Sequence, residues 1–209
     1  MNLDKIVVKP PLRHWQEILE EWVFMNKKIT RITNGKFAPY SYKERTNLGV
    51  LASAAVKTGW AALEECRTEK SEKEDETLSY QGRADLLLWR DARNDQVEAK
   101  FMRRSLTAPT LKRIEKVHGK ARGDAARSTT NESKKENCVA LTFIVPWVKS
   151  EEKKDDTHGQ VEALIDSLYR ELKPTIFAYV FSGDVPLVGA EHRTGLGVIL
   201  IGHAVLRLA

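Results

Sequence analysis

The sequence predicts an α/β fold with a central mixed β-sheet flanked by helices. Segments in which apolar residues recur with helical periodicity alternate with short apolar segments typical of strands. The run 139–145 is almost continuously apolar, which suits a strand covered on both faces of a sheet. The expected order is helix, strand hairpin, helix, strand, helix, strand and strand, so both parallel and antiparallel neighbours should occur.

Composition restricts the class of protein. The chain has 209 residues, of which 42% are hydrophobic and 30% charged, and this suits one well-buried globular domain. No apolar run is long enough to cross a membrane, and the first residues lack the apolar core of a signal peptide. Cys66 and Cys138 are too few for a disulfide framework or a zinc site, so we expect free thiols in a reducing cytoplasm. The net charge of +5 permits a polyanionic partner without demonstrating one.

The N-terminal part of the chain is expected to be helical. Residues 1–12 indicate an irregular lead-in, and a helix is predicted over about 14–27 because apolar residues recur there at helical spacing. We expect residues 1–40 to form a helical extension that packs on the core, and residues 41–209 to form the main domain. The aromatic stripe of the helix is expected to be core packing, with a dimer contact as the alternative; it contains Trp15 and Trp22.

A second helix is predicted from about Tyr42 to Thr58. Extending its apolar stripe back by four residues from Leu48 reaches Glu44, which places that carboxylate on the core-facing side of the helix start. An acid in a first turn also interacts favourably with the helix dipole, and the segment that begins at Ser41 matches a capping-box pattern. Both capping and a role in a site are therefore open for Glu44.

Two short strands, 82–89 and 96–101, are predicted to form a hairpin around the polar loop 90–95. Asp85 lies inside an otherwise apolar run, where an unpaired charge is costly and a divalent cation would offset it. Because side chains alternate along a strand, Glu98 and Lys100 share a face and lie about 6.6 Å apart along it. The hairpin therefore predicts two acids and a lysine in one place, with an ordinary surface ion pair as the alternative.

This arrangement of Asp85, Glu98 and Lys100 resembles the active site of the PD-(D/E)XK nuclease superfamily, and by order of elements the resemblance covers residues 41–148. It implies a restriction-endonuclease-like three-layer sandwich. It also implies that the two acids hold Mg²⁺, with Mn²⁺ as a substitute, and that the lysine positions water and stabilises charge on the phosphate. Ala84 stands where the superfamily usually has proline.

Members of that superfamily often supply a further acid from the helix that precedes the sheet. The layout from Glu44 to Trp60 resembles that of archaeal Holliday-junction resolvases, which implies that Glu44 is a third catalytic and metal-binding acid. Glu64 and Glu65 are alternatives if Trp60 opens a strand instead of continuing the helix. The segment 67–77 is almost entirely charged and is predicted to be a solvated loop.

The densest basic region of the chain follows the predicted hairpin. A helix is expected from near Pro109 to about Arg127, and its apolar stripe includes His118. We expect His118 to be packed in the core and not catalytic. The basic residues are expected to hold a nucleic-acid backbone, with a solvated helix face as the alternative. The residues assigned to this contact are Arg103, Arg104, Lys112, Arg113, Lys116 and Lys120.

Together these features predict a metal-dependent endonuclease that hydrolyses phosphodiester bonds in nucleic acid, with DNA as the expected substrate. A catalytically inactive subunit that keeps the nuclease fold, and binds nucleic acid or joins an assembly, is the alternative. A third hypothesis is an interaction protein built on the tryptophan-bearing helix. No membrane partner is expected, and a homodimer would suit cleavage of both strands of a duplex.

Overall fold

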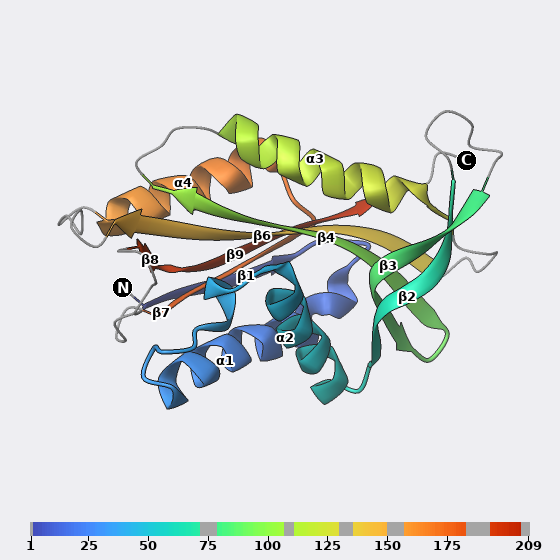
Figure 1. Ribbon diagram of the computed structural model, residues 1–209, viewed down its shortest axis with the longest axis horizontal. Helices are drawn as coiled ribbons and strands as arrows, with labels where there is room; N and C mark the ends of the chain where they lie inside the picture. The colour runs from blue at the N-terminus through green and yellow to red at the C-terminus, as the bar shows by residue number, and fades with distance from the viewer. Residues whose placement is uncertain are drawn as a thin grey trace.

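The computed structural model describes residues 2–71, 79–106, 111–129, 136–149, 157–182 and 193–205. A central sheet lies between two helical layers (Figure 1): α1 (Gln16–Ile32) and α2 (Glu44–Lys57) cover one face, and α3 (Leu111–Arg127) and α4 (Thr157–Leu172) cover the other. The predicted α/β class, with a mixed sheet flanked by helices, is confirmed. None of the helices in these ranges is long and apolar enough to cross a membrane.

The sheet has nine strands in the described residues, of which eight follow one path and β8 (Arg193–Gly195) pairs with β6. The pair β4 and β6 is parallel and the other pairs are antiparallel, so the prediction of both kinds of neighbour is confirmed. The path runs in the order β1 (Asn2–Val8), β7 (Ile176–Ser182), β9 (Gly197–Val205), β6 (Glu136–Lys149), β4 (Arg93–Ser105), β3 (Ser79–Arg90), β2 (Ala61–Ser71) and β5 (Ser128–Thr129).

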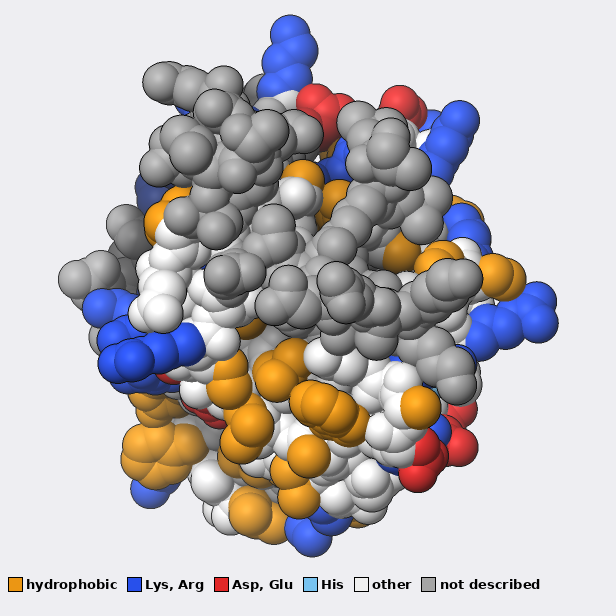
Figure 2. Space-filling model, turned by 90° about the vertical axis from the view of Figure 1, so that its right-hand side faces the viewer, with side chains coloured by type: hydrophobic (Ala, Val, Ile, Leu, Met, Phe, Trp, Pro, Cys, Tyr) orange, Lys and Arg blue, Asp and Glu red, His pale blue; other side chains and the backbone are white. Residues whose placement is uncertain are grey.

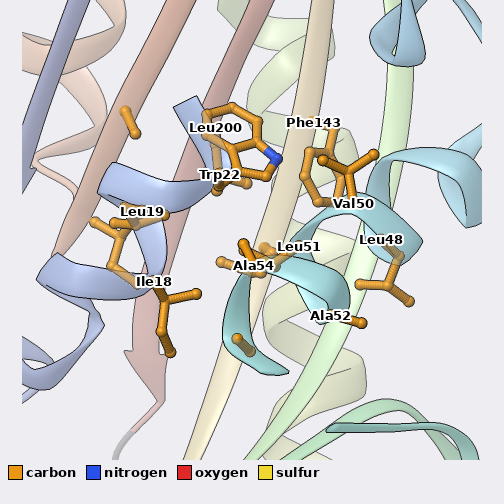
Figure 3. Packing of buried hydrophobic residues seen from close by; sticks show 14 of the residues in the cluster. Ile18, Leu19, Trp22, Leu48, Val50, Leu51, Ala52, Ala54, Phe143 and Leu200 are labelled. Carbon is orange, nitrogen blue, oxygen red and sulfur yellow. The ribbon is translucent and has the colours of Figure 1, made fainter. Parts of the chain in front are cut away.

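The face under α1 and α2 holds the larger hydrophobic core. The helix predicted over 14–27 is observed as a short 3-10 helix, η1 (Arg13–Trp15), followed by α1, which runs beyond the predicted end. Trp15 and Trp22 are fully buried, so their predicted core packing is confirmed. Figure 3 shows Trp22 beside Phe143 of β6, with ring centroids 6.4 Å apart.

The irregular lead-in predicted for residues 1–12 is wrong for residues 2–8, which form the edge strand β1 paired with β7. Ile6 and Val8 pack against the core under α1, while Leu3 and Val7 pack against the core on the opposite face. Because both faces of this short strand carry apolar residues, no clean alternation marks it in the sequence. Residues 2–40 therefore share one sheet and one core with the rest of the chain.

The solvated loop predicted for 67–77 is wrong for residues 67–71, and residues 72–78 lie outside the described part of the chain. Trp60 precedes β2, which pairs with β3 along its length, so the alternative in which a strand begins there is correct. Glu65 has φ of 55°, a left-handed conformation that interrupts the alternation of the strand. Because β2 lies near an edge of the sheet, it can carry several charged side chains, and these made its second half resemble a loop.

The strand β9 passes close to both of its neighbours at Gly202. A Cβ atom at this position would lie 2.7 Å from Leu141 Cδ2 and 3.0 Å from Ile176 Cβ. We expect Gly202→Ala to lower the free energy of unfolding by about 1–3 kcal/mol, because it overpacks a filled core. Gly119→Ala is the matched control: a Cβ there has no neighbour within 4 Å, and we expect a gain of about 0.5–1 kcal/mol from helix propensity. Urea unfolding measures both, and equal losses in the two variants would contradict the packing argument.

Candidate active site

The strands β3 and β4 separate next to the residues predicted for the site. They pair only over residues 86–90 and 93–97, joined by a two-residue turn at 91–92, so the predicted hairpin is confirmed with a loop shorter than 90–95. β4 continues past this ladder to Ser105, paired with β6 on its other side. Beyond Val97, the β3 side of β4 therefore needs other partners for its backbone.

Asp85 supplies one of those partners, and Glu44 lies near the same edge. The Oδ2 atom of Asp85 accepts a hydrogen bond from the backbone N–H of Ala99 at 2.7 Å. Glu44, in the first turn of α2, lies close enough to the backbone of Phe101 for that backbone to lower its pKa. Because the N–H groups of residues 99 and 101 face the same edge of the strand, the separation of β3 from β4 leaves room there for both Asp85 and Glu44. No side-chain hydrogen bond caps α2, so the capping box considered for Glu44 does not form.

Glu98 lies on the α3 side of the sheet and is almost completely buried, with 3% of the residue exposed. Its Oε1 atom accepts hydrogen bonds from Lys70 Nζ at 2.7 Å and from Ser128 Oγ at 3.2 Å. Lys70 belongs to β2 and Ser128 to β5, and these two strands pair with each other. The far end of β2 therefore folds over the site and brings a second lysine to it.

Lys100 points to the same side of the sheet as Glu98. Its Nζ atom donates to Asp124 Oδ2 of α3 at 2.9 Å and to the carbonyl oxygen of Ala99 at 3.0 Å. Asp124 also accepts a hydrogen bond from Arg127 at 2.6 Å. The Lys100 side chain remains 28% exposed, so its ammonium is held in place and can still meet a ligand from solvent.

The charges of these side chains act on one another. Burial raises the pKa of Glu44, and the charge of Asp85 adds to this effect against the lowering by Lys100. Burial also raises the pKa of Glu98 more than its lysine partner lowers it. Burial lowers the pKa of Lys100, but the negative charges of Asp124, Asp85 and Glu44 outweigh burial. The pKa of this lysine is therefore raised. The four predicted site residues therefore share one electrostatic neighbourhood.

The donor set suits a hard divalent cation. Partly buried carboxylates that repel one another are costly, and a cation offsets that cost. Mg²⁺ prefers such oxygen ligands and completes its shell with water. Within the described ranges, no three His, Cys, Asp or Glu side chains converge closely enough to hold an ion, and Glu98 is bonded to Lys70 and Ser128 instead. The residues fit Mg²⁺ by their chemistry: the charge of Asp85 acts on Glu44, and Glu98 is paired with the ammonium of Lys70.

The two alternatives for the third acid lie elsewhere. The Oε1 atom of Glu64 is 3.5 Å from the position that a Cβ would take on Gly49 of α2. Glu65 forms ion pairs with Arg45 at 3.2 Å and Arg83 at 3.5 Å. Of the three candidates, Glu44 is the one whose pKa responds to Asp85, to Lys100 and to the backbone of Phe101.

Most of the residues assigned to backbone contact are exposed. Arg103, near the end of β4, is exposed and donates a hydrogen bond to the carbonyl oxygen of Ser41. Arg104 differs, because alternation along β4 turns it inward and only 8% of the residue is exposed. Burial lowers the pKa of Arg104, and the charge of Arg113 lowers it further. The other four assigned residues are exposed on α3: Lys112, Arg113, Lys116 and Lys120.

His118 is packed in the core, as predicted. Its ring nitrogens lie 2.9 Å from Thr142 Oγ1 and 2.7 Å from Nδ1 of His203, whose Nε2 lies 3.0 Å from the carbonyl oxygen of Leu172. Because a carbonyl only accepts, Nε2 of His203 carries the proton, and donation runs from Thr142 through both rings to Leu172. Burial lowers the pKa of His118 to about 3, so this chain of hydrogen bonds is a neutral link between α3, β6 and β9.

Sequence reasoning missed three residues that bind the predicted site residues: Lys70, Asp124 and Ser128. Lys70 stands in a run of charges with no apolar neighbour to mark a strand. Asp124 carried a usable signal, because it interrupts a basic helix beside the buried residues Ala121 and Ala125. An acid at that position on a helix that packs against a predicted lysine is a candidate partner for it.

No family model matches the chain, and neither a curated protein nor a solved structure matches it.

Proposed function

We propose that this protein is a metal-dependent nuclease of the PD-(D/E)XK type, with a restriction-endonuclease-like sandwich fold and DNA as the expected substrate. The observation that carries the proposal is the meeting of Asp85, Glu44 and Lys100 at the point where β3 leaves β4. Carboxylates and an ammonium beside the edge of β4 that β3 leaves suit hydrolysis of a phosphate diester, which needs a cation and a stabiliser of negative charge.

Asp85, Glu44 and Glu98 would hold Mg²⁺ or Mn²⁺, and the bound ion lowers the pKa of water and offsets the charge of the phosphate. Lys100 would donate to a phosphate oxygen and stabilise the charge that grows in the transition state. Asp124 positions this lysine through its ion pair at 2.9 Å. Because burial raises the pKa of Glu44 and of Glu98, these two acids take up protons at a higher pH than ordinary glutamates do.

The exposed basic face of α3 supports a nucleic-acid substrate. α3 packs on β6 and on β4, the strand that carries Glu98 and Lys100. Lysine and arginine side chains of this kind contact phosphates and fix the register of a nucleic acid without reading its bases. A second copy of the chain would let the protein cut both strands of a duplex.

The test is a cleavage assay on supercoiled, linear, branched and single-stranded DNA and on RNA, with and without Mg²⁺. Asp85→Asn keeps an oxygen for the Ala99 N–H and removes the negative charge, so the fold should persist. We expect it to lower Mg²⁺-dependent cleavage by at least about a hundredfold. Glu65→Gln, at an exposed acid outside the site, is the control and should cleave normally. A wild-type chain that leaves every substrate intact, or an Asp85→Asn variant as active as wild type, would refute the proposal.

An assembly subunit is the second candidate, and one surface favours it. Leu63 and Trp89 are 55% and 52% exposed at the β2–β3 end of the sheet. Cross-strand pairing of Leu63 with Leu87 and of Ala61 with Trp89 places these apolar residues on one face. Figure 2, which views this end, shows hydrophobic side chains gathered on it. Such surfaces mark contacts with other proteins, and a subunit without chemistry would bind no Mn²⁺.

A further inference from the structure

Lys70 enters the candidate site from β2 and binds an acid expected to hold metal. Its Nζ lies 2.7 Å from Glu98 Oε1, and the two side chains are only 10% and 4% exposed. Removing two charges from water costs much of the free energy that their attraction provides. The burial of this ion pair is therefore weak evidence that its role is to stabilise the fold. Asp85 and Lys100 also act on the Glu98 carboxylate, which places Lys70 within the same group of charges.

The backbone of β3 leaves room for the stem of this lysine. A Cβ atom on Gly82 would lie 2.7 Å from Lys70 Cδ and 2.9 Å from Lys70 Cγ. These atoms are in the middle of the side chain, so a residue larger than glycine at position 82 would displace the whole stem from its path to Glu98. The placement of Lys70 is therefore specified by two strands and differs from that of a mobile surface lysine.

We propose that Lys70 and a divalent cation compete for the carboxylate of Glu98, so that binding of the metal releases Lys70. The inference rests on the proposed function, since it takes Glu98 as a metal ligand. An ammonium and a divalent ion at contact distance from one buried carboxylate repel each other strongly, because the local dielectric is low. Lys70 therefore lowers the affinity of the site for the metal and at the same time keeps Glu98 paired, which a buried acid requires.

The test is the affinity of the full chain for Mn²⁺, measured by isothermal titration calorimetry without nucleic acid. Lys70→Gln keeps a hydrogen-bond donor and removes the charge, so we expect Mn²⁺ to bind on the order of tenfold more tightly. Lys70→Arg keeps the charge and is the matched control, with an affinity close to that of wild type. Gly82→Ala moves the lysine stem away from Glu98 and should also tighten binding, which gives a second route if Lys70→Gln folds poorly.

The competition would be overturned if neither Lys70→Gln nor Gly82→Ala tightened Mn²⁺ binding. It would also be overturned if the same tightening persisted when Glu98→Gln is added, because Lys70 would then act through another group. Tightening in both variants, together with a wild-type chain that cleaves no nucleic acid, would refute the proposed function and leave the competition standing. Cleavage by wild type with unchanged Mn²⁺ affinity in the variants would refute the competition alone. A wild-type chain that binds no Mn²⁺ would overturn both.

Discussion

Replacing Lys100 by methionine is expected to lower the rate of Mg²⁺-dependent cleavage by about 10²–10³-fold, the range for losing one preorganised group that stabilises developing charge. Methionine keeps most of the aliphatic stem and removes the ammonium. In the native chain that ammonium is fixed by Asp124 and by the Ala99 carbonyl, and the surrounding carboxylates raise its pKa. Single-turnover cleavage at saturating Mg²⁺ isolates the effect on the chemical step.

The fold should survive this change, because Asp124 keeps Arg127 as a partner at 2.6 Å. Lys5→Met is the matched control: it removes one lysine charge from β1, at the opposite edge of the sheet from β2, and should leave the rate unchanged. A folded Lys100→Met variant that cleaves at the wild-type rate would contradict a role for Lys100 in stabilising charge. An equal loss in Lys5→Met would attribute the effect to net charge instead.

Local patterns predicted the helices and the hairpin because each pattern repeats within a single segment. The helical stripe, extended one turn back from Leu48, predicted that Glu44 faces the core, and the charges of Asp85 and Lys100 act on that side chain. Strand alternation placed Glu98 and Lys100 on one face, and both lie on the α3 side of the sheet. The four residues predicted for the site could therefore be brought together from periodicity and a resemblance, while their roles stay predictions.

Pairing between distant segments left no such pattern. Lys70 reaches Glu98 across 28 residues of sequence, from a strand whose charged residues suggested a loop. β1 pairs with β7, which lies near the other end of the chain, and its apolar residues divide between two cores. In both strands, the burial of a side chain depends on which other segment packs against it. The composition of the strand itself does not reveal that neighbour.

Asp95 shows the same limit, since its polarity assigned it to the hairpin loop and the structure buries it completely in β4. Its carboxylate accepts hydrogen bonds from His14 Nε2 at 2.5 Å, Trp15 Nε1 at 2.7 Å and Asn137 Nδ2 at 2.6 Å. The first two donors belong to η1 and the third to β6. One carboxylate therefore joins the N-terminal segment to the centre of the sheet.

Asp95→Ala is expected to lower the free energy of unfolding by about 3–5 kcal/mol, because it leaves the donors of His14, Trp15 and Asn137 without their acceptor. Asp95→Asn keeps the shape but turns an amide N–H₂ toward a donor, so a smaller loss of about 1–3 kcal/mol is expected. Glu115→Ala, at an exposed position of α3, is the control and should stay within about 0.5 kcal/mol of wild type. Urea unfolding measures all three.

If Asp95→Ala lowered the free energy of unfolding by less than about 1 kcal/mol, the three donors would have found other acceptors. The Asp95 carboxylate would then not be the link between the N-terminal segment and the sheet. The same variants distinguish an effect on the free energy of unfolding from an effect on metal binding. Asp95 and Glu98 lie on opposite faces of β4, and the hydrogen bonds of Asp95 go to His14, Trp15 and Asn137, which are not site residues. A folded Asp95→Asn chain should therefore bind Mn²⁺ as wild type does, although it unfolds at a lower urea concentration. A loss of Mn²⁺ affinity in that variant would mean that the N-terminal segment holds the β4 edge in the shape that the site requires.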